Sequence, residues 1–284
     1  MTGLCRKQIA VQVCGIVQGV GFRPFVYSLA RRLGLAGQVA NTGRGVEILL
    51  SGPEIDVDRF LHRLKTAPPP LARITGIAVS AHHGPEPGPG FSILASKDNG
   101  NAEVLISPDI ATCDDCLRDI FSPGNRRFHY PFTNCTNCGP RMTIIRKIPY
   151  DRAHTSMAVF QMCPACEGEY TDPGDRRFHA QPNACPECGP TVSWHDNRGR
   201  LLTTDNENCF AACAAALRDG RIVAIKGLGG FHLAVDAASE DAVVRLRRKK
   251  QRYAKPLAVM ARDPATAETI CRLKEAERKI LCSR

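Results

Sequence analysis

The stretch CGIVQGVGFR, residues 14–23, decides the fold of the first part of the chain. It follows the alternating run KQIAVQV, residues 7–13, which indicates a strand, and it precedes residues with helical spacing. A glycine-rich loop between a strand and a helix start can hold an anion on backbone N–H groups. The alternative is a tight turn whose glycines need positive φ angles. Neither a Walker A loop nor a dinucleotide fingerprint is indicated, because no G-K-[ST] and no parallel βαβ unit follow.

Residues 1–95 are predicted to form one small α+β domain. Helical spacing runs from Phe22 to Leu33 and stops at Gly34, and a second helical pattern runs from Val57 to Leu64. Further strands are expected at GQVAN (37–41), VEILLS (46–51), RITGIAVSA (73–81) and FSILAS (91–96). The order β-α-β-β-α-β plus an edge strand predicts a ferredoxin-like layout.

Arg23 and Asn41 are the candidate catalytic residues at this loop. Arg23 lies at the helix start, where free N–H groups and the helix dipole favour an anion, and its guanidinium adds a bidentate clamp for a phosphate. The short loop has room for a phosphate group and not for a nucleotide. Asn41, near the end of the second strand, is expected to reach the same place and orient a water molecule.

The cysteines form an internal repeat. The chain has 14 cysteines, and two units of the form C-x2-C-x18-C-x2-C lie fifty residues apart within residues 113–192. PGNRRFH (123–129) has its copy in PGDRRFH (173–179). The candidate metal ligands are Cys113, Cys116, Cys135, Cys138, Cys163, Cys166, Cys185 and Cys188.

Two C-x2-C pairs supply four thiolates for one tetrahedral Zn²⁺, and such a closed shell leaves no position for a catalytic water. The repeat therefore predicts two structural zinc ions in a tandem zinc-finger region, with redox cysteines or an iron–sulfur cluster as alternatives. The spacing does not decide which pairs share a metal, although pairing within each repeat is simpler. The absence of a secretory signal argues against disulfides.

The repeated basic motifs have two interpretations. Arg126, Arg127 and Phe128, with their copies in residues 176–178, combine charge with an aromatic ring and would suit a nucleic-acid surface. Alternatively they pack the two zinc units against their neighbours. The second interpretation is favoured, because no recognition-helix pattern accompanies the cysteines.

The remaining segments are a polar linker at 96–112 and a third, α/β region at 203–284. The third region is predicted to contain a helix, a strand, a glycine turn and a strand, followed by a basic stretch at 245–255. Its pattern stops without a closing element, so we expect an incomplete domain.

The formal charge of +10 indicates anionic partners. If eight thiolates bind two zinc ions, eight negative and four positive charges are added, and the balance falls to +6. That value suits phosphorylated small molecules as well as nucleic acid. Without a signal peptide or a run long enough to cross a membrane, the expected location is the cytoplasm, with no membrane partner.

GIVQGVGFR (15–23) followed by VANTGRGVEI (39–48) resembles the signature of the acylphosphatase family. That family hydrolyses carboxyl-phosphate anhydrides without a metal. The resemblance implies that Arg23 binds the phosphate and that Asn41 positions the attacking water. It also implies a backbone cradle for the phosphate oxygens made by Val17, Gln18, Gly19, Val20, Gly21 and Phe22.

AIKGLGGFHLAVDA (224–237) and KKQRYAKPLAVM (249–260) resemble the start of a YrdC-like domain. That family binds ATP and forms acyl-adenylates. The resemblance implies that Lys250, Arg252 and Lys255 contact phosphates or a carbamate. The alternative for residues 245–255 is a solvated basic helix face.

The three regions together resemble the HypF family, carbamoyltransferases of [NiFe]-hydrogenase maturation. The resemblance implies hydrolysis of carbamoyl phosphate, activation of the carbamate with ATP as carbamoyl-adenylate, and transfer to the C-terminal cysteine of HypE. Because the C-terminal domain of that family is absent, we expect these 284 residues to hydrolyse acyl phosphates without completing the transfer.

Two other functions stay open at this point. One is a zinc-containing nucleic-acid-binding protein, although nucleic acid is not the favoured partner. The other is a threonylcarbamoyl-adenylate synthase of tRNA modification, which the third region alone suggests. The first two regions are not expected in such an enzyme.

Overall fold

The computed structural model describes residues 6–97, 105–227 and 229–283. The chain divides into two compact units, residues 1–190 and 191–284, and each is described by itself. Part of the expected linker, residues 98–104, lies outside the described residues, as does Leu228 in the expected glycine turn. None of the described helices is both long and apolar enough to span a membrane.

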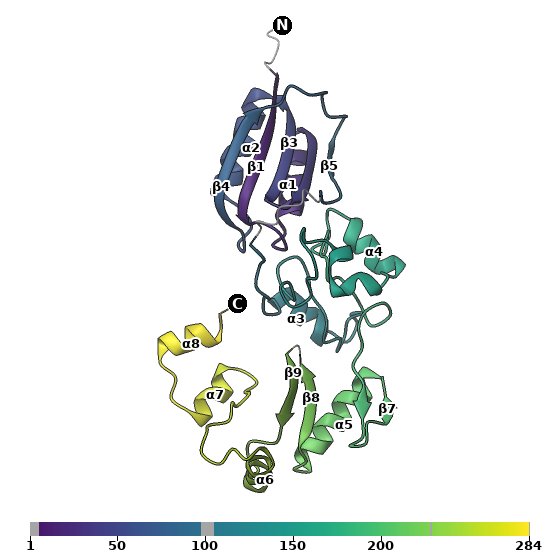
Figure 1. Ribbon diagram of the computed structural model, residues 1–284, viewed down its shortest axis with the longest axis vertical. Coiled ribbons are helices and arrows are strands. Elements are labelled where there is room, and N and C mark those ends of the chain that lie inside the picture. The colour runs from purple at the N-terminus through teal and green to yellow at the C-terminus, as the bar shows by residue number, and fades with distance from the viewer. Residues whose placement is uncertain (1–5, 98–104, 228, 284) are drawn as a thin grey trace. The chain divides into compact units, whose positions relative to one another are not determined.

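The first unit begins with a five-stranded sheet in the order β4-β1-β3-β2-β5 (Figure 1). Its strands are β1 (Arg6–Ile16), β2 (Ala36–Thr42), β3 (Gly45–Pro53), β4 (Arg73–Ala81) and β5 (Phe91–Ile93). The pairs β1–β3, β1–β4 and β2–β3 are antiparallel, and β2–β5 is parallel. The predicted ferredoxin-like layout is confirmed, although the expected strand at 91–96 ends at Ile93.

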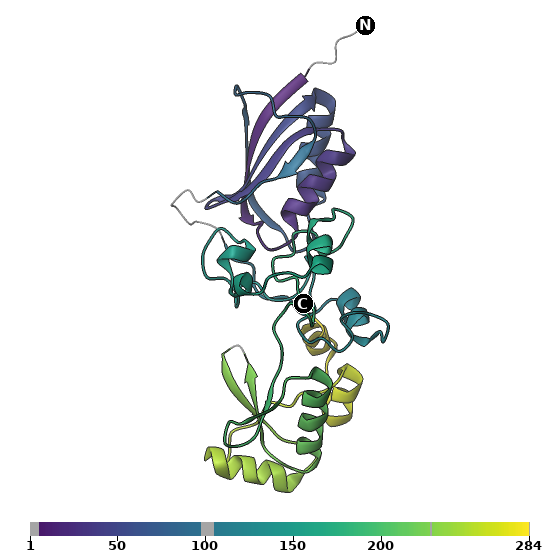
Figure 2. The ribbon, with the colours of Figure 1, turned by 90° about the vertical axis from the view of Figure 1, so that its right-hand side faces the viewer.

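Helices α1 (Phe22–Arg32) and α2 (Glu54–Thr66) pack on one face of this sheet (Figure 2). Alternate residues of β1 and the apolar stripes of both helices form one core, as period-2 and period-3.6 patterns require. Its fully buried members include Val11, Val13, Val26, Ile48, Leu50, Val57, Phe60 and Leu64.

The glycine loop joins β1 to α1 at the end of this core. Gly15 has φ +120° at a register shift of β1, and a Cβ atom there would lie 2.0 Å from the carbonyl oxygen of Arg73. Gly19 and Gly21 both have φ +72°, and Gly21 directly precedes α1. The glycines are therefore required by the turn itself, and the turn delivers Arg23 into the first turn of α1.

The cysteine region follows in the same unit. It contains α3 (Asp114–Phe121), α4 (Pro164–Thr171) and the two 3₁₀ helices η1 (Arg152–His154) and η2 (Ser156–Val159). Cys113 and Cys163 directly precede α3 and α4. His129 and His179 both have φ +53°, so the two repeats share a backbone conformation as well as a sequence.

The second unit contains the predicted helix and strand pair as α5 (Asn206–Arg218), β8 (Val223–Gly227) and β9 (Gly230–Ala234), in the order expected from the sequence. The strands β8 and β9 pair antiparallel. A short hairpin of β6 (Trp194–His195) and β7 (Leu201–Thr203) precedes them and was not expected. The basic stretch lies in α6 (Glu240–Lys250) and the loop after it, and α7 (Pro264–Ile270) and α8 (Glu275–Leu281) follow.

Candidate active site and metal centres

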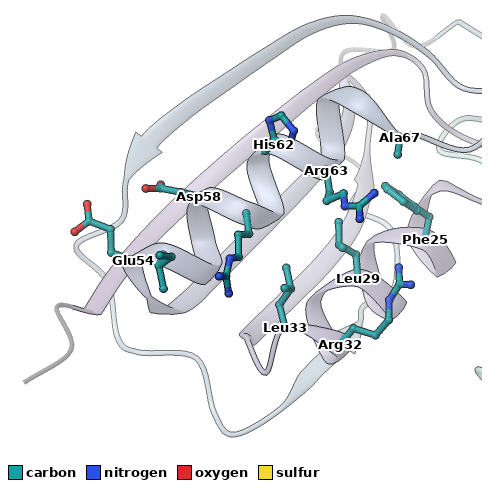
Figure 3. A pocket seen from close by; sticks show the side chains of 11 residues that line it. Phe25, Leu29, Arg32, Leu33, Glu54, Asp58, His62, Arg63 and Ala67 are labelled. Atoms are coloured by element: carbon teal, nitrogen blue, oxygen red, sulfur yellow. The ribbon is translucent and has the colours of Figure 1, made fainter.

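Several hollows lie in or against the ferredoxin-like part of the first unit, among them a groove between its helices and a small hollow at the glycine loop. The larger, about 1170 Å³, is an open groove between α1 and α2, where charged side chains of both signs border apolar ones (Figure 3). The smaller, about 20 Å³, lies at the glycine loop and has room for about one water molecule. The two share no lining residue, and the predicted site residues line only the smaller one.

The smaller hollow brings together both candidate catalytic residues and most of the expected phosphate cradle. Arg23 is 7% exposed and Asn41 is 1% exposed. Val20 does not line the hollow, because its side chain belongs to the hydrophobic core. The lining from the ferredoxin-like part consists of Val17, Gln18, Gly19, Gly21, Phe22, Arg23, Pro24 and Asn41.

Gln18 fixes the loop to its surroundings. Its amide Nε2 donates to the carbonyl oxygens of Thr42 and Gly45, each at 2.9 Å. Its Oε1 accepts from the backbone N–H of Tyr150 at 2.9 Å. A buried amide with all of these bonds holds the loop, the β2–β3 turn and a segment between the cysteine repeats in one arrangement.

One polar atom of the Asn41 side-chain amide has a hydrogen-bond partner, and the other has none among the described residues. Its Nδ2 donates to the carbonyl oxygen of Tyr150 at 3.1 Å, which sets the orientation of the amide. Its Oδ1 is buried and, among the described residues, has no hydrogen-bond partner. A buried acceptor that lines the hollow can accept a hydrogen bond from a water molecule there.

Arg23 makes an ion pair with Asp151, Nη2 to Oδ1 at 2.6 Å. The other carboxylate oxygen of Asp151 accepts from the backbone N–H of Ser96 at 3.3 Å and from the Ser96 hydroxyl. Asp151 comes from the segment between the repeats, so the cysteine region contributes to the site directly.

Arg141 connects the first four-cysteine group to the glycine loop. It is 2% exposed, and its Nε donates to the carbonyl oxygen of Gly19. Its Nη1 and Nη2 donate to carbonyl oxygens of the second cysteine knuckle, among them that of Cys138 at 3.1 Å and that of Thr136 at 2.9 Å. The position of Gly19 therefore depends on the knuckle.

The second repeat closes the hollow with residues 179–181. Burial lowers the pKa of His179 to about 4, and the positive charge of Arg23 adds to the effect. The imidazole is neutral near pH 7, so it adds no second positive charge beside Arg23.

The four-cysteine groups assemble within each repeat, which is the simplest of the pairings left open by the spacing. All ligand atoms of a group lie within 4.8 Å of one another. A tetrahedral site with Zn–S bonds of about 2.3 Å needs sulfur atoms roughly 3.8 Å apart. The measured Sγ–Sγ distances are 3.7 Å for Cys113–Cys135, 3.8 Å for Cys135–Cys138, 3.7 Å for Cys163–Cys185 and 3.5 Å for Cys166–Cys188. The donor set therefore fits a closed tetrahedral metal site in each repeat.

The repeated arginines cross from each repeat to the other. Arg126 donates to Cys166 Sγ at 2.7 Å, and Arg176 donates to Cys116 Sγ at 3.0 Å. A four-thiolate zinc site carries two net negative charges, so each guanidinium offsets charge on the opposite group.

The neighbouring arginines make the reciprocal ion pairs. Arg127 binds Glu169 with two hydrogen bonds, at 2.8 and 2.6 Å, and Arg177 binds Asp119. Burial works to raise the pKa of Glu169, but Arg127 and its neighbouring arginines outweigh it and hold the pKa below its usual value. These contacts support the packing interpretation of the repeated motif over a nucleic-acid surface.

Lys250, Arg252 and Lys255 lie at the end of α6 and in the loop after it. Arg252 Nη2 donates to the carbonyl oxygen of Pro256 at 3.2 Å, which folds this loop back on itself. Both lysine side chains are exposed, and within the described part of the second unit neither ammonium group has a hydrogen-bond partner.

Sequence reasoning missed Asp151, Arg141, Tyr150 and His179 as residues of the site. The first three lie after the second knuckle of repeat one, where the fifty-residue correspondence with repeat two ends. The sequence could have indicated them only through this loss of correspondence, which sets residues 141–151 apart from the repeats. His179 carried no signal of its own, because the first repeat has a histidine at the equivalent position.

Comparison with protein families gives three matches along the chain. The acylphosphatase family matches residues 9–93, and the HypF finger matches residues 112–145 and 162–195. The family described as telomere recombination, which comprises Sua5, YciO and YrdC proteins, matches residues 215–283.

Individual relatives agree. Carbamoyltransferase HypF2 of Cupriavidus necator is 52% identical over 92% of this chain and 32% of its own length. The probable carbamoyltransferase HypF of Methanocaldococcus jannaschii is 44% identical over 98% of this chain and 36% of its own length. An acylphosphatase of Caldivirga maquilingensis is 43% identical over 30% of this chain and 92% of its own length. The chain thus spans about a third of the length of the HypF relatives and nearly the whole of the acylphosphatase.

Solved structures agree as well. Full-length HypF in the phosphate- and nucleotide-bound form superposes with a TM-score of 0.90 at 46% identity, covering 98% of this chain and 36% of that one. HypF of T. kodakarensis gives a TM-score of 0.88 at 44% identity, covering 98% of this chain and 35% of its own. The chain therefore belongs to the HypF family, with an acylphosphatase domain, two HypF fingers and part of a YrdC-like domain.

Proposed function

We propose that the glycine-loop site hydrolyses carbamoyl phosphate, as the first step of a carbamoyltransferase of [NiFe]-hydrogenase maturation. The observation that carries the proposal is the placement of Arg23 and the uncommitted Oδ1 of Asn41 around one hollow beside the loop. A guanidinium with backbone N–H groups suits a phosphate, and a free acceptor suits the water that attacks it.

In this mechanism the N–H groups of residues 17–22 and the Arg23 guanidinium bind the phosphate oxygens and stabilise the charge that develops on them. Asn41 Oδ1 accepts a hydrogen bond from a water molecule and thereby directs a lone pair of the water oxygen at phosphorus. The new P–O bond forms as the bond from phosphorus to the carbamoyl oxygen breaks. Carbamate leaves as the anion, and the proton lost by the water passes to solvent or to the products.

The hollow of about 20 Å³ is smaller than the substrate, so residues around the glycine loop move outward when carbamoyl phosphate enters. The segment around Tyr150, held by hydrogen bonds to Gln18 and Asn41, is the part of the cysteine region that covers the loop.

The four-cysteine groups are proposed to hold one structural zinc ion each. Four thiolates fill a tetrahedral shell, so zinc there organises the fold and leaves the chemistry of hydrolysis to the glycine loop. Metal analysis of the purified chain is expected to give two zinc ions per molecule.

The HypF relatives, of whose length this chain spans about a third, are described as carbamoyltransferases, and the later steps are proposed on that basis. We propose that Lys250, Arg252 and Lys255 contact the phosphates of ATP or the carbamate during formation of carbamoyl-adenylate, and that HypE accepts the carbamoyl group in the cytoplasm. We assign residues 1–95 to the acylphosphatase domain, 96–112 to a linker, 113–192 to the fingers and 203–284 to the YrdC-like part. The nucleotide-bound HypF structure supports ATP as a co-substrate, since this chain matches it closely over 98% of its length.

Phosphate release from carbamoyl phosphate tests the hydrolysis step. Arg23→Ala and Asn41→Ala are each expected to lower kcat/KM by about a hundredfold, the scale seen when one group that stabilises or positions the transition state is removed. Arg32→Ala is the matched control, because Arg32 lies on the same helix and lines the groove between α1 and α2. Absence of hydrolysis by the wild-type chain, or hydrolysis unaffected by both changes, would exclude the proposed reaction.

A further inference from the structure

Asp151 belongs to the finger region in sequence and to the acylphosphatase site in space. It lies 128 residues from Arg23 along the chain and pairs with it at 2.6 Å. Arg23 is almost fully buried and Asp151 is about four-fifths buried. A charge pair at this depth is weakly screened by solvent, so the attraction between the two groups is stronger than on the surface.

The segment that carries Asp151 is anchored on the second finger. The backbone N–H of Arg152 donates to Gln181 Oε1 at 2.7 Å, and its Nη1 donates to the carbonyl oxygens of Gln181 and Asn183 at 2.6 and 2.9 Å. Arg152 Nη2 donates to the carbonyl oxygen of Phe160 at 2.7 Å. The residue next to Asp151 is therefore held by several bonds, which fixes the carboxylate in place.

The contact uses only part of the Arg23 fork. A guanidinium has five N–H donors, and the ion pair with Asp151 engages Nη2. Among the described residues, Arg23 Nε and Nη1 have no hydrogen-bond partner, so donors remain for an anion at the loop. The second carboxylate oxygen of Asp151 is occupied by Ser96, which offsets part of its negative charge.

We propose that Asp151 is a positioning residue: it holds the Arg23 guanidinium in the orientation that receives the phosphate, so that the finger region completes the acylphosphatase site. The inference rests on the proposed function, because it assigns Arg23 to phosphate binding. A preorganised guanidinium binds phosphate without first giving up rotamer freedom, which makes both binding and the chemical step more favourable.

The competing arrangement has the opposite consequence. If Asp151 occupied the place of the phosphate on Arg23, removal of its charge would tighten phosphate binding. The two roles therefore predict changes of opposite sign in the same measurement.

The test measures inorganic phosphate binding by calorimetry and carbamoyl phosphate hydrolysis for the wild-type chain, Asp151→Asn and Asp151→Gly. Asp151→Asn is expected to weaken phosphate binding and to lower kcat/KM, each about tenfold or more. Formate is expected to restore activity to Asp151→Gly, because it returns a carboxylate to the vacated space. Asp58→Asn is the matched control, since its carboxylate pairs with Lys7 on the surface of the acylphosphatase domain at 3.0 Å.

The formate arm separates positioning from folding, because a misfolded variant gains no activity from a free carboxylate. Unchanged or tighter phosphate binding by Asp151→Asn overturns the inference, as does a Gly variant that formate does not restore. If the wild-type chain binds phosphate without hydrolysing carbamoyl phosphate, the proposed function fails. The ratio of phosphate affinities of the wild-type chain and Asp151→Asn still decides the role of Asp151. If the wild-type chain binds no phosphate, both proposals fail.

Discussion

The two finger repeats are nearly identical in framework and differ in the segments that come after them. Each starts a short helix at its first knuckle, places a histidine at φ +53°, and sends two arginines to the other repeat. After the second knuckle of repeat one, the chain places Arg141 on the glycine loop and Asp151 on Arg23. After the second knuckle of repeat two, it leaves the first unit.

The difference separates framework residues from site residues. Positions that the repeats share bind metal or neutralise charge, whereas Arg141, Tyr150 and Asp151 lie where the repeat correspondence ends. Thr136 and residues 179–181 line the hollow from within the repeats, and His179 shares its backbone conformation with His129, although only His179 lines the hollow. The repeat thus provides a rigid frame, and the departures from it serve the active site.

Removal of zinc is expected to have the largest effect on stability and activity, because both repeats would lose the metal that holds their cysteines together. Structural zinc contributes about 10–16 kcal/mol in isolated finger peptides. A strong chelator should unfold the finger region, which circular dichroism would measure. It should also lower acylphosphatase activity by more than tenfold, which phosphate release would measure. The acylphosphatase of C. maquilingensis, which this chain matches through its first domain, is the control and should keep its activity. Full activity of this chain after complete metal loss would contradict the dependence.

Removal of one crossing arginine tests whether the repeats are equivalent. Arg127→Ala and Arg177→Ala each remove one arginine from a largely buried carboxylate, while Arg126 stays beside Glu169 and Arg176 beside Asp119, so each change should cost about 1–3 kcal/mol. Denaturant unfolding should give similar losses for the two variants. A large loss in one and less than about 1 kcal/mol in the other would show that the two repeats do not carry the frame equally.

Arg141 tests the departure from the repeat. Arg141→Ala removes the bond to Gly19 and should lower kcat/KM for carbamoyl phosphate about tenfold, which corresponds to about 1.4 kcal/mol. Thr191, which stands fifty residues later at the equivalent position and is exposed, provides the control. Thr191→Ala should leave both activity and stability unchanged. Equal effects of Arg141→Ala and Thr191→Ala would contradict the inferred difference between the segments that follow the two repeats.

His179 gives the smallest expected effect. Its pKa is about 4 in the folded chain and about 6.5 when unfolded, so the unfolded state binds the extra proton first as the pH falls. Stability should therefore decline as the pH falls from about 6.5 to 4, by about 1 kcal/mol after allowance for solvent screening. His179→Gln should flatten this decline in thermal unfolding curves. A decline of the same size in His179→Gln would contradict the assignment of this pH dependence to His179.

Local patterns were sufficient for much of this structure. Alternating strands and helical spacing predicted the ferredoxin-like order, and the offset of fifty residues identified both four-cysteine groups. Arg23 and Asn41 were brought to one hollow, as the glycine loop and the second strand suggested. Asp151 could not be predicted, because its contact with Arg23 spans 128 residues and leaves no periodic trace in the sequence. The contacts of the arginines with the opposite repeat could not be predicted either. Because the two repeats have nearly the same sequence, contacts within a repeat and contacts between repeats have the same sequence signature.

The crossed arginines also constrain how this region evolves. Each finger takes its closest counter-charges from the other, so a lone finger would keep an unneutralised thiolate cluster and an acid without its closest arginines. Loss of one copy therefore damages the copy that remains. We therefore expect the two fingers to be inherited as a single module, and substitutions at Asp119 or Glu169 to be accompanied by changes in the arginines of the opposite copy.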